Sequence, residues 1–309
     1  MGIEGSYKIL VIGGSGFIGG AIVKHAISIG WEVDSMGLAV PSKEKQISGA
    51  NYIRADITNP DTLKILSSKK YHYVVNAGGY INHSIFSDGG SEVLGAHFGG
   101  VVNLVQNINK AKLIRFVNIG SSDEYGDAAA PQLENTRERP ISPYSAGKVA
   151  ATHLLQMLHK TEGFPAVALR LFLCYGPGQD HMRFLPYLIS RCLADEEIKV
   201  SPGEQLRDYC FIDDIVEAVF MVLSNDAADG KVFNIASGKP VSIRTIVEKM
   251  VDIIGSGKPN FGAVPYREGE SMELYADINY ADEVLSWTPK TQLSEGLEKT
   301  IRFYRSQLA

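Results

Sequence analysis

The stretch Gly13-Gly14-Ser15-Gly16-Phe17-Ile18-Gly19-Gly20 decides the fold of this chain. It follows the short apolar run 8–12 and precedes residues 21–27, where apolar side chains recur at helical spacing. This order predicts a strand, a tight glycine turn and a helix. Glycine lacks a Cβ, so a pyrophosphate can approach the backbone amides at the helix start. The stretch therefore predicts a dinucleotide-binding turn; the alternative is a tight turn that binds nothing.

Strand-like and helix-like segments alternate through the first half of the chain. We expect strands at residues 32–36, 51–56, 72–76, 113–119 and 166–173, and helices at 59–66, 91–110 and 142–162. Such alternation predicts an α/β fold, a doubly wound parallel sheet of the Rossmann type. Ligands of these sheets bind at the carboxyl ends of the strands, where the glycine turn, Asp56, residues 77–79 and Ser121 fall.

The composition of the sequence changes beyond Tyr175, where the expected helices and strands become shorter and proline and glycine more frequent. We expect a dinucleotide-binding Rossmann domain over residues 1–173, to which residues 211–235 return. Residues 174–210 and 236–309 are expected to form a smaller C-terminal lobe that binds the substrate.

Composition excludes several classes of protein. The net charge of −5 and the lack of a basic cluster argue against a nucleic-acid partner. We expect no membrane partner, because no apolar segment is long enough to cross a bilayer, and the absence of a leader pattern predicts a cytoplasmic protein. Three distant cysteines, Cys174, Cys192 and Cys210, fit a reducing compartment. His153 and His159 fall on different faces of one expected helix, so no metal site is predicted.

The sharpest chemical signal is Ser-Pro-Tyr-Ser-Ala-Gly-Lys at residues 142–148. Ser142 and Pro143 are typical of a helix start, which places Tyr144 in the first turn and Lys148 on the same face. A nearby ammonium and a helix N-terminus both lower the pKa of a tyrosine from its ordinary value of about 10. The pair suits proton transfer to or from a hydroxyl during hydride chemistry, and its alternative is accidental spacing on a surface.

A second polar run, Asn-Ile-Gly-Ser-Ser-Asp-Glu-Tyr-Gly at residues 118–126, follows the expected fifth strand. A hydroxyl of Ser121 or Ser122 at this place could bind a substrate oxygen beside Tyr144. The alternative for both serines is loop capping, which is the commoner use of serine after a strand.

Taken together, these motifs resemble the extended short-chain dehydrogenases/reductases, in the branch of nucleotide-sugar epimerases, dehydratases and reductases. The resemblance spans nearly the whole chain. The matching pieces are residues 13–19, Asp56, residues 76–79, residues 121–126, Tyr144 with Lys148, and residues 170–178, 203–214 and 266–270.

The resemblance implies a role for each matching residue. Tyr144 would be the acid/base, Lys148 would bind the nicotinamide ribose, and Ser121 would be the catalytic hydroxyl, with Ser122 and Asp123 as additional acid/base groups. The dinucleotide would contact Gly13, Ser15, Gly16, Phe17, Ile18, Gly19, Asp56, Ile57, Ala77, Gly78, Gly79, Tyr144 and Lys148. A nucleoside-diphosphate sugar would contact Ser122, Tyr175, Arg207 and Arg267.

The two arginines would grip the diphosphate with their forked donors, although surface salt bridges are their alternative use. The resemblance also implies a homodimer formed through the helices expected at 91–110 and 142–162. Two positions depart from the family pattern: His97 and Leu173 each stand where an asparagine is usual.

Cofactor choice depends on the end of the second strand. An acidic residue there usually binds the adenosine ribose and repels a 2′-phosphate, but this position falls at Gly37. Ser35, Lys43 and Lys45 are near, which favours NADP(H). NAD(H) is the alternative if Asp34 or a shifted loop supplies the carboxylate.

The sequence therefore predicts an NADP(H)-dependent oxidoreductase that acts at C4 of a nucleotide-linked sugar. The favoured reaction is reduction of a nucleoside-diphosphate 4-keto-6-deoxy sugar by Ser121, Tyr144 and Lys148. An NAD-dependent 4-epimerase or 4,6-dehydratase is the alternative. A non-catalytic NAD(P)-binding sensor is the alternative from another class.

Overall fold

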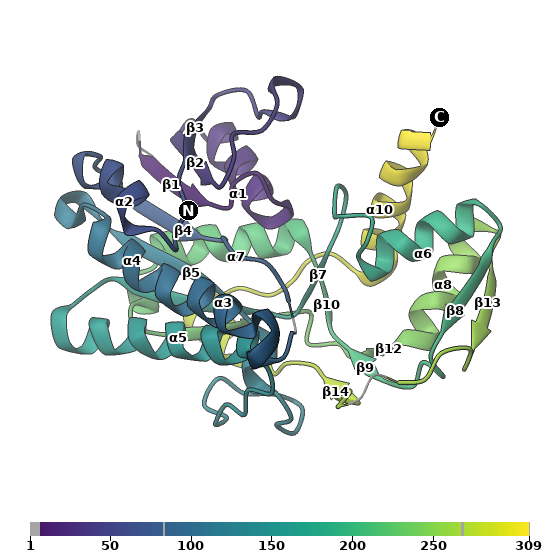
Figure 1. Ribbon diagram of the computed structural model, residues 1–309. Helices are drawn as coiled ribbons and strands as arrows, with labels where there is room; N and C mark the ends of the chain where they lie inside the picture. The colour runs from purple at the N-terminus through teal and green to yellow at the C-terminus, as the bar shows by residue number, and fades with distance from the viewer. Residues whose placement is uncertain (1–6, 83, 267–268, 309) are drawn as a thin grey trace.

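The computed structural model describes residues 7–82, 84–266 and 269–308 (Figure 1). Its main element is a seven-stranded sheet in the order β11-β6-β5-β4-β1-β2-β3, in which every neighbouring pair is parallel. The predicted doubly wound α/β fold is confirmed. The strands are β1 (Lys8–Ile12), β2 (Glu32–Gly37), β3 (Ala50–Arg54), β4 (Tyr73–Asn76), β5 (Arg115–Ser121), β6 (Ala166–Leu171) and β11 (Val232–Ile235).

The order of the strands reverses between β1 and β4. The chain runs outward from β1 through β2 to β3, then crosses back to β4 and runs outward through β5 and β6 to β11. Ligands of open α/β sheets bind in the crevice at such a reversal. The turns that follow β1 and β4 therefore lie side by side where a ligand is expected.

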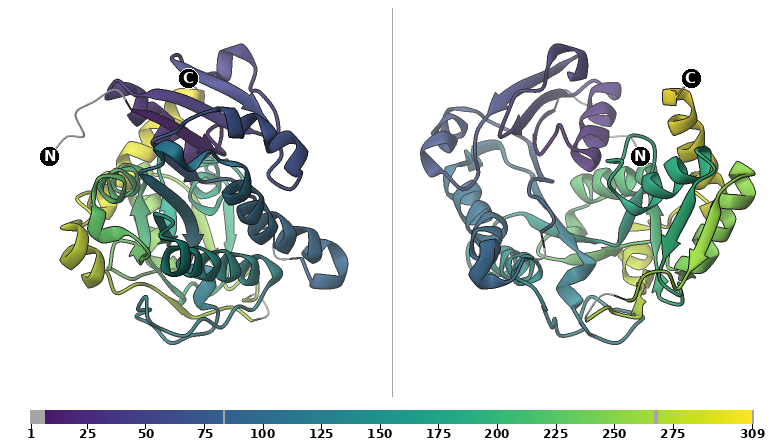
Figure 2. Two further views of the ribbon diagram at one scale, coloured as in Figure 1. Left: turned by 90° about the vertical axis from the view of Figure 1, so that its left-hand side faces the viewer. Right: turned by 45° about the vertical axis from the view of Figure 1, so that its right-hand side comes forward.

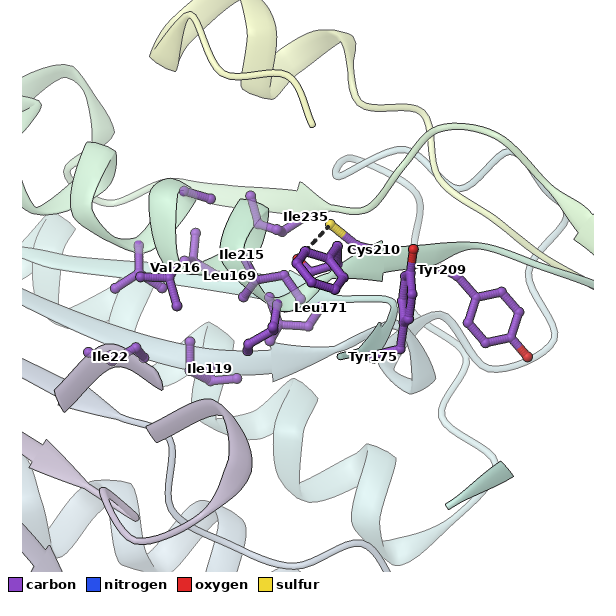
Figure 3. Packing of buried hydrophobic residues seen from close by; sticks show 14 of the residues in the cluster. Ile22, Ile119, Leu169, Leu171, Tyr175, Tyr209, Cys210, Ile215, Val216 and Ile235 are labelled. Carbon is purple, nitrogen blue, oxygen red and sulfur yellow. Dashed lines mark hydrogen bonds between the residues drawn. The ribbon is translucent and has the colours of Figure 1, made fainter. Parts of the chain in front are cut away.

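Helices cover both faces of the sheet, as the alternating sequence predicts. On one face, α1 (Phe17–Ser28) and α7 (Ile212–Ser224) share a buried cluster with β1, β5 and β6. Figure 3 shows part of this cluster, where Ile215 and Val216 of α7 approach Leu169 and Leu171 of β6. On the other face, α2 (Pro60–Leu63), α3 (Ser91–Leu94), α4 (Gly100–Asn107) and α5 (Pro143–Glu162) lie along the strands.

The C-terminal part forms a smaller body beside the sheet, on the right of Figure 1 and of the right-hand view in Figure 2. Two parallel strands, β8 and β13, pack with α6 and α8, and α10 lies against α6. The remaining elements are β7 (Leu173–Tyr175), α6 (Phe184–Leu193), β8 (Glu197–Val200), β9 (Leu206–Arg207), β10 (Tyr209–Phe211), β12 (Val241–Ser242), α8 (Ile243–Ile254), β13 (Lys258–Phe261), β14 (Glu273–Leu274), α9 (Asn279–Leu285) and α10 (Leu293–Leu308).

Residues 212–235 return to the sheet. Helix α7 packs against α1, and β11 pairs with β6 in parallel from Val232 opposite Ala168 to Ile235 opposite Leu171. The exact boundaries between the two parts of the chain stay a prediction.

Three predicted elements differ from the observed ones. The expected helix 91–110 is interrupted by a π-helical turn over Gly95–Gly99 and ends at Asn107. The expected strand 166–173 divides after Leu171, because Leu173 donates its amide to Asp208 and begins β7, which pairs with β10. The expected helix 59–66 is α-helical only to Leu63 and continues as a 3₁₀ turn. Among the described residues, no helix combines the length and the apolarity that a membrane crossing requires.

Candidate active site

The glycine turn after β1 meets the chain that follows β4. Gly13 has a φ of +75°, and a Cβ built on it would lie 2.7 Å from the Ala77 carbonyl oxygen. A Cβ on Gly19 would lie 2.2 Å from the Gly13 carbonyl oxygen. Only glycine at position 19 therefore lets helix α1 come this close to the turn. The structure brings together the two expected cofactor segments, the turn from Gly13 to Gly19 and Ala77-Gly78-Gly79.

The start of α1 has donors to offer an anion. Its N-cap residue, Gly16, makes no side-chain cap, and its first turn contains no acidic residue. The first amides of a helix have no partner within the helix, and the helix dipole favours an anion there. Ser15 and Gly16 are exposed. The residues present therefore fit the pyrophosphate of a dinucleotide.

Asp56 and Ile57, which were expected to contact the dinucleotide, follow the carboxyl end of β3. Asp56 accepts hydrogen bonds from the Thr58 amide and hydroxyl, both at 2.8 Å, which closes a short turn. Beside it, the Ile57 carbonyl accepts a hydrogen bond from Asn103 of α4 at 2.8 Å. Both residues are half-buried at the same edge of the sheet as the glycine turn.

Helix α5 begins as its sequence predicts. Ser142 caps it by accepting the Ser145 amide at 3.1 Å, and Pro143 is the first helical residue. Tyr144 and Lys148 follow one turn apart and are 5% and 7% exposed, so they are not a surface pair. The ammonium nitrogen of Lys148 lies 5.8 Å from the centre of the Tyr144 ring.

Ser121, at the end of β5, is hydrogen-bonded through its side chain to Tyr144. Its hydroxyl also accepts the Asp123 amide at 3.1 Å. Burial raises the pKa of Tyr144 well above its ordinary range, while the hydrogen bond with Ser121 acts in the opposite direction. The negative charges of Asp123 and Glu124 raise this pKa further, and Arg183 lowers it. Without ligands, Tyr144 is therefore a protonated phenol at neutral pH.

Lys148 is fixed by its own hydrogen bond, since its Nζ donates to the Ile119 carbonyl oxygen at 2.7 Å. Burial lowers its pKa to about 8, against the attraction of Glu124 and Asp123. Lys148 is thus mostly protonated at neutral pH and titrates close to it. A group of this kind is common where protons are moved.

His97, which stands in place of the usual asparagine, closes the site from the π-helical turn Gly95–Gly99. Its ring meets the Tyr144 ring edge-on, with centroids 4.8 Å apart. Its Nε2 lies 2.9 Å from the Tyr80 carbonyl oxygen, which can only accept, so Nε2 carries the proton. Burial and the charge of Lys148 lower the pKa of His97 to about 4, so the ring is neutral at pH 7. π-Helical turns are frequent at functional sites.

Ser122 and Asp123, the expected additional acid/base groups, form the start of a 3₁₀ turn over Ser122–Tyr125. Ser122 is buried, whereas Asp123 is half-buried and close enough to Tyr144 and Lys148 to affect the pKa of each. Asp123 is therefore the better placed of the two.

The expected substrate residues do not all reach the site. Tyr175 is 1% exposed, and its ring packs against Tyr209 and Phe211 in the core, as Figure 3 shows for Tyr209. Its expected place in a sugar pocket stays a prediction, and in this structure β7 pairs with β10 and the side chain lies in the core. Arg207 is buried and ion-paired with Glu270. Arg267 lies outside the described residues.

The end of β2 settles one alternative about the cofactor. The Asp34 carboxylate is 1% exposed and accepts hydrogen bonds from Tyr71 at 2.6 Å, Lys69 at 3.0 Å and Asn51 at 3.1 Å. It is therefore not free to bind a ribose. Gly37 ends the strand, three residues further on.

A groove of about 1080 Å³ runs behind the glycine turn, between α1, α7 and the loop before β3. Gly14 and Ser15 line it together with Lys45 of that loop and Asp213 of α7. Ser121, Tyr144 and Lys148 are not among its lining residues. The reactive groups therefore lie outside this groove.

The sequence and the structure are similar to known nucleotide-sugar enzymes. A "UDP-glucose 4-epimerase" of Mycolicibacterium smegmatis is 28% identical over 313 residues, covering 97% of this chain and 99% of that protein. A "dTDP-glucose 4,6-dehydratase" of Haemophilus influenzae is 25% identical, covering 96% and 97%. The solved structure of a UDP-glucose 4-epimerase from Thermotoga maritima, with UDP-glucose, has a TM-score of 0.91 at 27% identity, covering 98% and 100%.

These likenesses agree with the observed fold. The expectation of an enzyme is confirmed, because the similar proteins are named for reactions. The preference for NADP(H) finds no support among them. A family model described as "NAD dependent epimerase/dehydratase family" matches residues 9–236, and the chain belongs to that family.

Proposed function

We propose that this chain is an NAD-dependent 4-epimerase of a nucleoside-diphosphate sugar. The observation that carries the proposal is the meeting of Ser121, Tyr144 and Lys148 at the carboxyl edge of the sheet, where β4 alone separates β5 from the strand that leads into the glycine turn. Epimerisation needs these three groups and no others, since the same carbon is oxidised and then reduced.

The proposed chemistry begins with the C4 hydroxyl of the sugar hydrogen-bonded to Ser121 and Tyr144. A bound NAD would supply the hydride acceptor for oxidation at C4 and the hydride donor for the reduction that follows. Tyr144, a protonated phenol without ligands, would be ionised in the complex by the added positive charge of the nicotinamide. Its Oη would then take the hydroxyl proton in the first half of the cycle and give it back in the second. Lys148 stabilises the phenolate by its charge, which offsets the effect of burial on the tyrosine.

Cofactor preference is proposed as NAD, in place of the preference for NADP(H) expected from the sequence. The family description supports this choice. Because Asp34 is occupied by Tyr71, Lys69 and Asn51, NAD would be held without a carboxylate from β2. The pyrophosphate contacts at α1 and the adenine contacts at Asp56 and Ile57 would then supply most of the affinity.

A 4,6-dehydratase is the second candidate, favoured by the position of Asp123 close to Tyr144 and Lys148. Elimination of water across C5 and C6 needs a further acid and base beside the hydride site. Ser122 is buried, so Asp123 would have to supply one of these groups without a second carboxylate beside it. The reductase expected from the sequence has less support, because the similar proteins are epimerases and dehydratases.

The substrate is proposed to be bound through its diphosphate by Arg207, with Arg267 as the expected second arginine. A homodimer through the helices expected at 91–110 and 142–162, which correspond to α3 with α4 and to α5, remains an expectation, as does a cytoplasmic location. Both helices lie on one face of the sheet, as a shared interface would require.

The test is incubation of the purified chain with UDP-glucose, UDP-N-acetylglucosamine and dTDP-glucose, without added dinucleotide. A 4-epimerase converts at least one of them to its C4 epimer with no change of mass. A product that is lighter than its substrate by the mass of one water indicates the dehydratase instead. Consumption of added NADPH with a nucleoside-diphosphate 4-keto-6-deoxy sugar, and no conversion in the first panel, would restore the reductase.

A further inference from the structure

Glu124 is a fully buried carboxylate that binds three separate elements of the site. Its Oε1 accepts the Ser121 amide at 3.0 Å. Its Oε2 accepts the Thr152 hydroxyl and the Arg170 Nε, both at 2.9 Å. No role was expected for this residue from the sequence. A buried carboxylate satisfied on both oxygens holds its partners in fixed places.

The three partners belong to the elements that carry the reactive groups. Ser121 ends β5. Thr152 is one turn beyond Lys148 and two turns beyond Tyr144, so all three lie along one face of α5. Arg170 is in β6, directly opposite Gly120. Glu124 therefore joins the catalytic strand, the catalytic helix and the neighbouring strand at one point.

Arg170 is a firm anchor for this carboxylate. It is buried, and its other nitrogens donate to the Glu134 carbonyl oxygen at 3.3 Å and to the Glu138 carboxylate. Its guanidinium carbon lies 4.6 Å from the centre of the Tyr125 ring. An arginine with all three nitrogens hydrogen-bonded and a ring against its face has little freedom to move.

Gly120 provides the room that this arrangement needs. A Cβ at Gly120 would lie 2.5 Å from Glu124 Oε1 and 3.2 Å from the Leu169 carbonyl oxygen. Any other residue at this position would push the carboxylate away from the Ser121 amide. The position of the Glu124 carboxylate therefore depends on the absence of a side chain at Gly120.

We infer that Glu124 is a positioning residue, which ties Ser121 to the face of α5 that carries Tyr144 and Lys148 and fastens both to Arg170. Without this tie, the Ser121 hydroxyl and the Tyr144 hydroxyl lose their fixed separation. Since both must contact one sugar oxygen, the chemical step suffers more than substrate binding.

The charge of Glu124 has a second, measurable effect on Lys148. The groups that face Lys148 are Asp123 and Glu124 from the 3₁₀ turn, His97 from the π-helical turn and Tyr144 from its own helix. Glu124 is the larger of the two carboxylate influences that raise the pKa of Lys148. Removing its charge takes away this influence and leaves Arg170 paired with Glu138 alone, so the pKa of Lys148 must fall.

The experiment compares Glu124→Gln with Glu138→Gln in the full chain. Both carboxylates bind Arg170, but Glu138 is partly exposed and also lies 3.3 Å from His153, an exposed side chain. The first readout is the pH titration of the ¹⁵N-labelled side chain of Lys148 by NMR, assigned through its loss in Lys148→Met. The second is kcat and KM with the nucleotide sugar that the wild type converts.

Glu124→Gln is expected to lower the pKa of Lys148 by about one unit and kcat by about 10–100-fold, with KM unchanged. Glu138→Gln is expected to leave both readouts near the wild-type values. Equal titrations of Lys148 in the two variants, or equal kcat values, overturn the inference. The kinetic arm rests on the proposed function, but the titration does not, so the failure of one can be told from the failure of the other.

If Glu124→Gln does not fold, Thr152→Val serves in its place, because it removes one donor and keeps the charge. The inference then predicts a lower kcat with an unchanged KM and an unchanged titration of Lys148. Wild-type kcat in Thr152→Val contradicts it.

Discussion

Lys148 Nζ donates a hydrogen bond to the Ile119 carbonyl oxygen at 2.7 Å, which joins helix α5 to strand β5 two residues before Ser121. The bond fixes one end of the lysine and holds its charge beside the Tyr144 ring. The protein thus meets one of the three donors of the buried ammonium. The proposed chemistry depends on this relationship.

Tyr144→Phe is expected to lower kcat by about 10²–10⁴-fold, because it removes the only group proposed to move the hydroxyl proton. Binding of NAD and of the nucleotide sugar should persist, since the ring and its contact with His97 remain. Stopped-flow turnover and calorimetric binding measure the two effects. Tyr187→Phe, on the half-exposed surface of α6, is the control. Wild-type turnover by Tyr144→Phe would exclude Tyr144 as the acid/base.

Lys148→Met is expected to stabilise the fold at neutral pH while it abolishes turnover. Burial lowers the pKa of Lys148 to about 8 from 10.5, so below pH 8 the folded chain bears the full penalty of a buried ammonium. Between pH 8 and 10.5 the unfolded chain binds more protons than the folded chain, so the wild type gains stability as the pH rises.

Lys148→Met should therefore raise the free energy of unfolding at pH 7 by at most about 3 kcal/mol, and this increase should become smaller above pH 8. Urea unfolding across this range measures it, with Lys160→Met on the exposed end of α5 as the control. A gain that does not change with pH is incompatible with a lowered pKa for Lys148.

Gly19→Ala is expected to lose NAD binding and to destabilise the chain by about 1–3 kcal/mol. Its Cβ would lie 2.2 Å from the Gly13 carbonyl oxygen, which is backbone and cannot rotate away. Gly95→Ala is the matched control, because Gly95 is helical, exposed and has no atom within 4 Å of a built Cβ. Thermal unfolding and NAD titration check both variants. Intact NAD binding in Gly19→Ala would argue against the turn as the pyrophosphate site.

Arg207→Lys is expected to raise KM for the nucleotide sugar about 10-fold with little change in kcat, because a lysine cannot make two parallel hydrogen bonds to a phosphate. Arg207 is held by Glu270 in this structure, so it must exchange a carboxylate for the diphosphate. Steady-state kinetics measure the effect, with Arg191→Lys on α6 as the control. A change in kcat alone would place Arg207 outside the diphosphate site.

Gly37→Asp is expected to raise the preference for NAD over NADP by about 10-fold, through repulsion of the 2′-phosphate. The substitution fits, since a Cβ at Gly37 meets only the Ala39 carbonyl oxygen at 3.8 Å. Gly37→Asn has nearly the same shape without the charge and is the control. Affinities for the two dinucleotides measure the preference, and an equal change in both variants would show that charge is not the cause.

Local patterns predict most of this fold. The glycine turn with its flanking strand and helix, and the alternation that follows it, indicate the parallel sheet because each signal lies within a few neighbouring residues. The pair Tyr144 and Lys148 is predictable for the same reason, since helical spacing alone places both on one face.

Contacts between distant segments are not predictable in this way. Tyr175 enters the core because β7 pairs with β10, thirty-six residues away by number. Asp34 is occupied by Lys69 and Tyr71, which are far from it in the sequence. Glu124 lay inside a recognised motif, yet its partners Thr152 and Arg170 come from two later elements. In the sequence, the one indication of a role for Glu124 is that a carboxylate stands between an apolar strand and Tyr125.

The most direct test of the central claim is to incubate the purified chain with nucleotide sugars deuterated at C4, without added dinucleotide. The proposed function predicts a C4 epimer that keeps its deuterium, because the same hydride leaves and returns, and no product from Tyr144→Phe. An unchanged set of sugars, together with NADPH oxidation by a nucleoside-diphosphate 4-keto-6-deoxy sugar, would contradict it.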